Sequence, residues 1–203
     1  MGITIHYSFN AGERPVTEIR QLVGLLHRSA VDLPFEQLDD EIVELTGTEC
    51  IPSTGSSPDP WYLMKIRAIK IDIYNYQAQE YPVHIVGFTA LTRPGAEELD
   101  IFLCRYSNSF DWVAHSWCKT QYAQLPEHGG SANFVLAHTM IIALLDKALE
   151  LGILEEVVDE AGYWQERNPH KLISSSENWN ALITEIGNTL GQIPNALKDF
   201  LSD

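Results

Sequence analysis

Apolar side chains recur every three or four positions between Gly130 and Gly152, which is the spacing of one face of an α-helix. Ser131 is placed to cap the first turn by accepting from a free backbone N–H, and Gly152 to end the helix in a left-handed conformation. A helix with so wide an apolar face is largely buried, so the pattern predicts a central buried helix over 132–151. The stripe comprises Phe134, His138, Ile141, Ile142, Leu145 and Leu149, and it is widened by Met140, Leu144 and Leu151.

Alternation of apolar and polar side chains predicts several strands before this helix. Residues 3–9 alternate strictly, which places His6 on the polar face of a strand. Residues 82–92 and 98–106 flank an Arg-Pro-Gly turn, which is typical of a hairpin. Residues 33–47 fit either a short helix starting at Pro34 or a strand over 41–46, and we predict the strand.

The alternation in residues 61–76 changes phase near Ala68. A strand can move its apolar side chains to the other face only by gaining an extra residue. We therefore predict a long strand with a β-bulge or sharp bend at Ala68.

Two further helices are predicted at the ends of the chain. Pro15 suits the first turn of a helix that runs to about Ala30. Ser174 followed by Glu177 is a capping-box pattern, and it predicts helical structure over residues 175–203. A strand, a helix, several antiparallel strands and then helices indicate an α+β fold. We expect an antiparallel sheet of about five to six strands with helices on one face, in a single domain covering 1–203.

The net charge of −15 disfavours binding to nucleic acid or to an anionic membrane, because phosphate groups would be repelled. We recognise no apolar run that is long enough to span a bilayer. We also recognise no signal peptide. Residues 32–49 hold seven Asp or Glu and no Lys or Arg. This segment is either a solvated acidic face or a docking site for a basic partner.

Cys50, Cys104 and Cys118 are odd in number and widely spaced, which favours reduced thiols in the cytoplasm. Cys118 is the candidate nucleophile, with a histidine as its base. If residues 112–122 form a strand, His115 and Cys118 face opposite sides, and the base must be His128, His138 or His6. A buried structural thiol is the alternative.

His138 lies in the middle of the apolar stripe. It is either a core histidine whose ring nitrogens find hydrogen-bond partners or a base in a dry site. Asp159 and Glu160 precede Gly162, Tyr163 and Trp164, a turn where a carboxylate beside aromatic rings could shape a pocket. Both carboxylates are also explained as surface acids after a helix.

A metal centre is a further alternative, with ligands from His115, Cys118, His128 and His138, although their spacing matches no close-paired zinc signature. No cofactor is predicted, and the chain lacks a phosphate-binding P-loop and a Rossmann fingerprint. It also lacks a G-x-S-x-G elbow.

Two functional hypotheses follow. The first is a small-molecule-binding or hydrolytic pocket bounded by 112–122, 128–138 and 159–164, using Cys118, His138, His115, Asp159 and Glu160. The second is a non-enzymatic interaction or regulatory protein that docks a basic partner on its acidic surface. Neither hypothesis predicts the oligomeric state.

Overall fold

The computed structural model describes residues 3–53, 58–71 and 79–172. Its centre is a seven-stranded antiparallel sheet in the order β2-β6-β7-β8-β1-β9, with β3 also paired to β6. The strands are β1 (Thr4–Glu13), β2 (Gln37–Leu38), β3 (Val43–Thr46), β6 (His84–Leu91), β7 (Glu98–Arg105), β8 (Asp111–Lys119) and β9 (Leu154–Asp159). The predicted α+β class is confirmed, and so is the hairpin formed by β6 and β7.

The remaining elements are short, apart from two helices. The helices are α1 (Val16–Val31), α2 (Tyr62–Arg67), α3 (Gly130–Glu150) and α4 (Tyr163–Glu166). Four short 3-10 helices within the described residues are η1 (Gly47–Cys50), η2 (Gln121–Gln124), η3 (Pro126–His128) and η4 (Pro169–Leu172). A separate two-stranded sheet is formed by β4 (Lys70–Ile71) and β5 (Gln79–Glu80).

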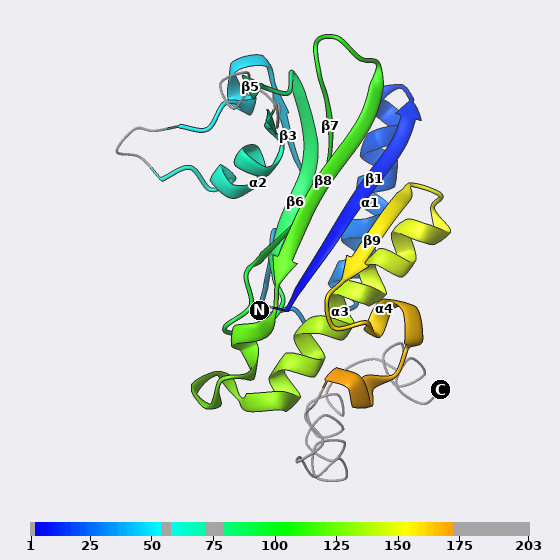
Figure 1. Cartoon of the computed structure of the whole chain (residues 1–203). Helices are drawn as coiled ribbons and strands as arrows, with labels where there is room; N and C mark the ends of the chain where they lie inside the picture. Colours follow the sequence, from blue (N-terminus) through cyan, green and yellow to red (C-terminus); the bar gives the residue numbers. More distant parts are fainter. Residues whose placement is uncertain (1–2, 54–57, 72–78, 173–203) are drawn as a thin grey trace.

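The two long helices, α1 and α3, contact each other on one face of the sheet, behind the strands in Figure 1. Helix α3 is buried along most of its length, as its wide apolar stripe predicts. By length and hydropathy it could cross a membrane, which the sequence analysis did not expect, but 78% of the apolar window is buried inside the protein. Its apolar surface is thus used for packing in the fold.

The ends of α3 test the predicted caps. Gly152 is left-handed with φ of 68°, so the predicted C-terminal stop is confirmed. The predicted Ser131 cap is wrong, because Ser131 lies within the helix and the capping position is Gly129, with φ of 103° and no side-chain bond. After Gly152 the chain forms the edge strand β9, where the sequence analysis expected only a turn.

The predicted strand over 61–76 is wrong in its first half, because residues 62–67 form α2. Met64 and Ala68 are both buried and lie four residues apart, which is helical spacing. The apparent phase change at Ala68 was thus the mark of a short helix. Only Lys70 and Ile71 of the predicted second half are described as strand, and residues 72–78 lie outside the described part. The predicted helical segment 175–203 also lies outside it.

Strand register decides which side chains meet the long helices. Ile5 is paired with Cys118 on one side and Asp159 on the other, and all three point toward α3. The next row, Trp117–His6–Val158, points to the opposite face, where all three are exposed. On that opposite face α2 covers the neighbouring part of the sheet, because the Arg67 guanidinium lies 4.9 Å from the centre of the Trp117 ring.

Candidate functional site

His138 is the centre of a buried polar network that links α3 to the ends of β8 and β9. Its Nδ1 lies 3.1 Å from Thr120 Oγ1, and its Nε2 lies 3.2 Å from Asp159 Oδ1. The second contact has the length of an ion pair, but the Nε2 N–H is not directed well enough to count as a hydrogen bond. Two of the predicted site residues, His138 and Asp159, are therefore brought together.

Asp159 also organises the turn that follows β9. Its two carboxylate oxygens accept from the backbone N–H groups of Ala161 and Trp164, each at 2.8 Å. Burial acts to raise the pKa of Asp159, but the contact with His138 and these two N–H donors hold it below its ordinary value. Asp159 is therefore a carboxylate that the fold keeps ionised.

The network is closed to solvent. Thr120 and His138 are fully buried, and the side chain of Asp159 is too. The rings of Phe134 and Tyr163 pack on the imidazole, with centroids 5.6 and 6.2 Å away. A threonine, a histidine and an aspartate in contact can hold or move a proton, and here all three side chains lie inside the core.

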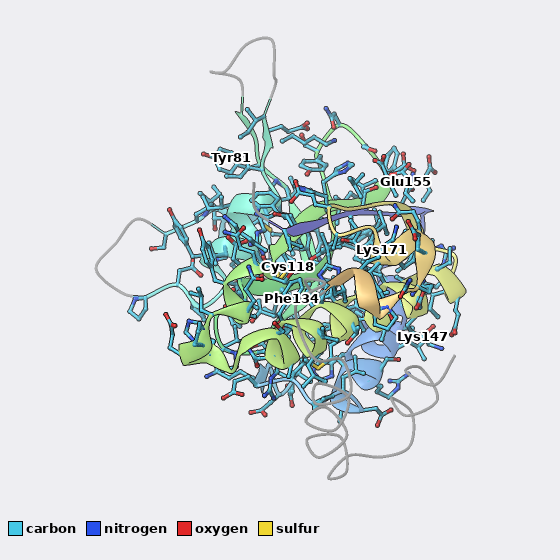
Figure 2. All side chains as sticks on the ribbon, turned by 60° about the horizontal axis from the view of Figure 1, so that its bottom comes forward. Tyr81, Cys118, Phe134, Lys147, Glu155 and Lys171 are labelled. Carbon is cyan, nitrogen blue, oxygen red and sulfur yellow. The ribbon has the colours of Figure 1, made fainter. Side chains whose placement is uncertain are left out.

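The other predicted site residues do not join this network. Cys118 is fully buried, and its thiol donates to the carbonyl oxygen of Glu97 at 3.2 Å. Burial raises the pKa of that thiol, which works against nucleophilic chemistry. Glu160 is exposed, and its carboxylate accepts from the backbone N–H of Thr4 at 2.8 Å. Figure 2 shows Cys118 and Phe134 near the middle of the molecule.

His115 and His128 lie elsewhere. His115 is exposed on the outer face of β8, beside Ser8 of β1. His128 is half-buried in η3, and its ring lies so close to Gly95 that a Cβ there would be 2.5 Å from it. Within residues 3–53, 58–71 and 79–172, no three His, Cys, Asp or Glu side chains are grouped to hold a metal ion. The alternative metal centre therefore has no geometry to support it.

Thr120 was not among the predicted residues, although a signal for it existed. It lies two positions after Cys118, so it falls on the inward side of the same strand alternation. A polar side chain at an inward position requires a buried hydrogen-bond partner. That partner is His138, which is distant in sequence and close only through the packing of α3.

A second buried polar cluster joins α2 and β1 to β7, and it was also not predicted. The Arg67 guanidinium forms an ion pair with the Asp100 carboxylate, and it donates to the carbonyl oxygen of Glu98 at 2.9 Å. Tyr7 donates to the backbone carbonyl oxygen of Asp100 at 2.7 Å. Burial raises the pKa of Asp100 to about 6, the charge of Glu98 adds to this, and Arg67 opposes it.

An acidic groove of about 570 Å³ lies at the other edge of the sheet. We use this name for the depression lined by residues 39–44 and Trp61. Glu44 is held by Arg20 at 2.5 Å and by His84 at 2.8 Å, and Asp39 accepts from the backbone N–H of Thr89. Asp40 and Glu41 are exposed, and no described residue pairs with either of them.

A smaller cavity of about 200 Å³ lies on the outer face of β8, β1 and β9. It is lined by His6, Tyr7, Ser8, His115, Ser116, Trp117, Glu156 and Val158. Unlike the acidic groove, it mixes imidazole, hydroxyl, carboxylate and apolar groups, so its lining favours no one class of ligand.

Comparison of the chain with protein-family models, with curated proteins and with solved structures found no match.

Proposed function

We propose that this protein is a non-enzymatic interaction protein whose acidic groove binds a basic segment of a partner protein. The observation that carries the proposal is the pair of exposed carboxylates, Asp40 and Glu41, which have no partner within the described part of the chain and lie in a groove with an aromatic wall. A Lys or Arg side chain entering the groove would gain ionic contacts and could stack on Trp61.

The charge of the whole chain supports the same conclusion. A net charge of −15 attracts a cationic partner from a distance and speeds its encounter with the groove. Within the groove, Glu44 is already paired with Arg20 and contacts His84, and the hydrogen bond to Arg20 is the main cause that lowers the pKa of Glu44 to about 2. Asp39 accepts from Thr89, so the exposed carboxylates that a partner can reach are those of Asp40 and Glu41.

The test is calorimetric titration of the full chain with a synthetic peptide of alternating lysine and serine. The double variant Asp40→Asn/Glu41→Gln should weaken binding by about fivefold, as expected for two exposed charge contacts. Binding by the wild type should also weaken as salt is raised, because exposed charges are screened.

A matched control is Glu127→Gln/Glu156→Gln, which removes two exposed charges outside the groove. The control should bind the peptide almost as well as the wild type does. Equal weakening by both double variants would mean that only the overall charge matters, and the groove would lose its assigned role.

A second candidate function is the small-molecule or hydrolytic site bounded by 112–122, 128–138 and 159–164. It is supported by one specific observation, the Thr120–His138–Asp159 network. Its test is hydrolysis of a panel of small nitrophenyl esters by the wild type and by His138→Gln. Turnover that vanishes in the variant, with the fold retained by circular dichroism, would favour this candidate. Equal rates for the two proteins would remove it.

A further inference from the structure

Helix α2 has its polar and apolar side chains in the reverse of the usual arrangement. Its two cationic side chains, Lys65 and Arg67, are only 9% and 4% exposed. Met64 is buried, but the other large apolar side chains, Tyr62, Leu63 and Ile66, are 41%, 43% and 39% exposed. A helix on a protein surface normally places its apolar stripe inward and its charges outward.

Specific polar contacts hold α2 in this orientation. Lys65 Nζ lies 2.9 Å from an Asp59 carboxylate oxygen, and Arg67 forms its ion pair with Asp100. Just beyond the helix, the carbonyl oxygen of Ala68 accepts from the Tyr106 hydroxyl at 2.8 Å. Rotating α2 to bury its apolar side would break these contacts and leave Asp100 buried without a cation.

The reversed arrangement is costly for the protein on its own. Buried charges lose their hydration, and their mutual attraction compensates only with good geometry. Apolar side chains that stay exposed contribute no free energy of burial to the fold, and a contiguous patch of them commonly marks an interaction site. Helix α2 therefore presents an apolar surface that the described residues leave open.

This apolar surface adjoins the acidic groove. Trp61, which lines the groove, is the residue directly before the first residue of α2. A partner segment whose cations reach Asp40 and Glu41 past Trp61 thus lies next to the first turn of α2, where Tyr62 and Leu63 are exposed. The groove and helix together offer carboxylates at one end and apolar side chains at the other.

We propose that Tyr62, Leu63 and Ile66 form the second half of one docking surface, and that the partner is a basic amphipathic segment. Its cationic side chains enter the acidic groove, and its apolar side chains pack on α2. This inference rests on the proposed function, and the charge of the groove identifies the occupant as cationic.

The test compares two peptides of equal length and equal lysine content, one with leucine and one with serine at the intervening positions. The wild-type full chain should bind the leucine peptide roughly tenfold more tightly, because buried apolar anchors dominate such interfaces. The variant Leu63→Ser/Ile66→Ser should bind both peptides equally. The matched control Val31→Ser/Leu149→Ser removes two other exposed apolar side chains, on α1 and α3, and should keep the preference.

The outcomes separate this inference from the proposed function. If the serine peptide binds through Asp40 and Glu41 but leucine adds nothing, only the inference fails. The inference also fails if the preference persists in Leu63→Ser/Ile66→Ser or is lost equally in the control. If neither peptide binds, the proposed function fails as well.

Two other occupants of the apolar surface are tested directly. A photoreactive benzoylphenylalanine in place of Leu63 should crosslink to the leucine peptide. A crosslink in the peptide-free chain to a second copy, or to residues 173–203 of the same chain, would show a different occupant and overturn the inference.

Discussion

Asp100 and Asp159 are both buried carboxylates in contact with a basic side chain, yet their pKa values shift from the ordinary value in opposite directions. The pKa of Asp100 is raised to about 6, whereas the pKa of Asp159 is lowered. Asp159 accepts from two backbone N–H groups and contacts His138. Asp100 meets Arg67 through one oxygen, while the other oxygen, Oδ1, has no hydrogen-bond partner. Burial raises a carboxylate pKa unless enough donors face the charged form.

The difference matches the position of each residue in the fold. Asp159 lies where β9 ends, and it fixes the turn and the middle of α3 to the sheet. Asp100 lies on the opposite face of the sheet, and it holds α2 through Arg67. The first network maintains the core, whereas the second maintains the orientation of a helix that we assign to partner binding.

The largest expected effect is that of removing one member of the Arg67–Asp100 pair. Asp100→Ala leaves the guanidinium of Arg67 buried without a carboxylate, so the free energy of unfolding should fall by about 3–5 kcal/mol. Replacing both residues, as in Arg67→Met/Asp100→Leu, should recover more than half of that loss. Urea unfolding of the wild type, Asp100→Ala and Arg67→Met/Asp100→Leu measures these free energies. A double variant no more stable than Asp100→Ala would contradict this explanation.

The dependence of stability on pH should have opposite signs at the two aspartates. The folded-state pKa of Asp100 lies above the ordinary value, so its favourable contribution is complete below about pH 4. That contribution is lost as pH rises through 6, by roughly 3 kcal/mol. The folded-state pKa of Asp159 lies below the ordinary value, so its contribution is present above about pH 4 and is lost as pH falls.

Urea unfolding at a series of pH values tests these signs, with the wild type compared with Asp100→Asn and with Asp159→Asn. The stability advantage of the wild type over Asp100→Asn should shrink as pH rises from 5 to 7. Its advantage over Asp159→Asn should shrink only on acidification. The same sign at both residues would refute the role given to the backbone donors.

At neutral pH, Asp159→Ala should lower the free energy of unfolding by about 2 kcal/mol, because two part-buried N–H groups lose their acceptor and His138 loses its buried carboxylate. Glu160→Gln is the natural control, since Glu160 is exposed and makes its bond to Thr4 at the protein surface. Its effect should stay within about 0.5 kcal/mol. A larger loss for Glu160→Gln would shift the structural role to that residue.

The smallest effect concerns access to the side of the sheet that packs against α3. Cys118 points to this side, and its thiol donates to the carbonyl oxygen of Glu97, so the thiol reports whether this region opens. Alkylation of Cys118 in the native chain should proceed no faster than unfolding, because the thiol is fully buried and its pKa is raised. Rapid alkylation of Cys118 at pH 8 would contradict this expectation and would again make Cys118 a candidate nucleophile.

Local periodicity was a sound guide where an element buries one regular face. The alternation of residues 3–9 matches the observed burial except at Ser8, which is buried, and the stripe of α3 matches it except at Leu149, which is exposed. The same method failed at α2, because a helix of six residues offers too few positions to separate a period of 3.6 from one of 2. The exposure of three of the four large apolar side chains of α2 obscured the pattern further, since only Met64 among them lies on the buried face.

The sequence by itself determined the α+β class, the central helix, and His138 and Asp159 as residues of interest. Only the tertiary structure joined those two to Thr120, because β8, β1 and β9 must lie in that order beneath α3. It alone paired Arg67 with Asp100, 33 residues further along the chain. Contacts of this kind depend on strand order and on the side of the sheet a helix covers, and neither leaves a periodic trace in the chain.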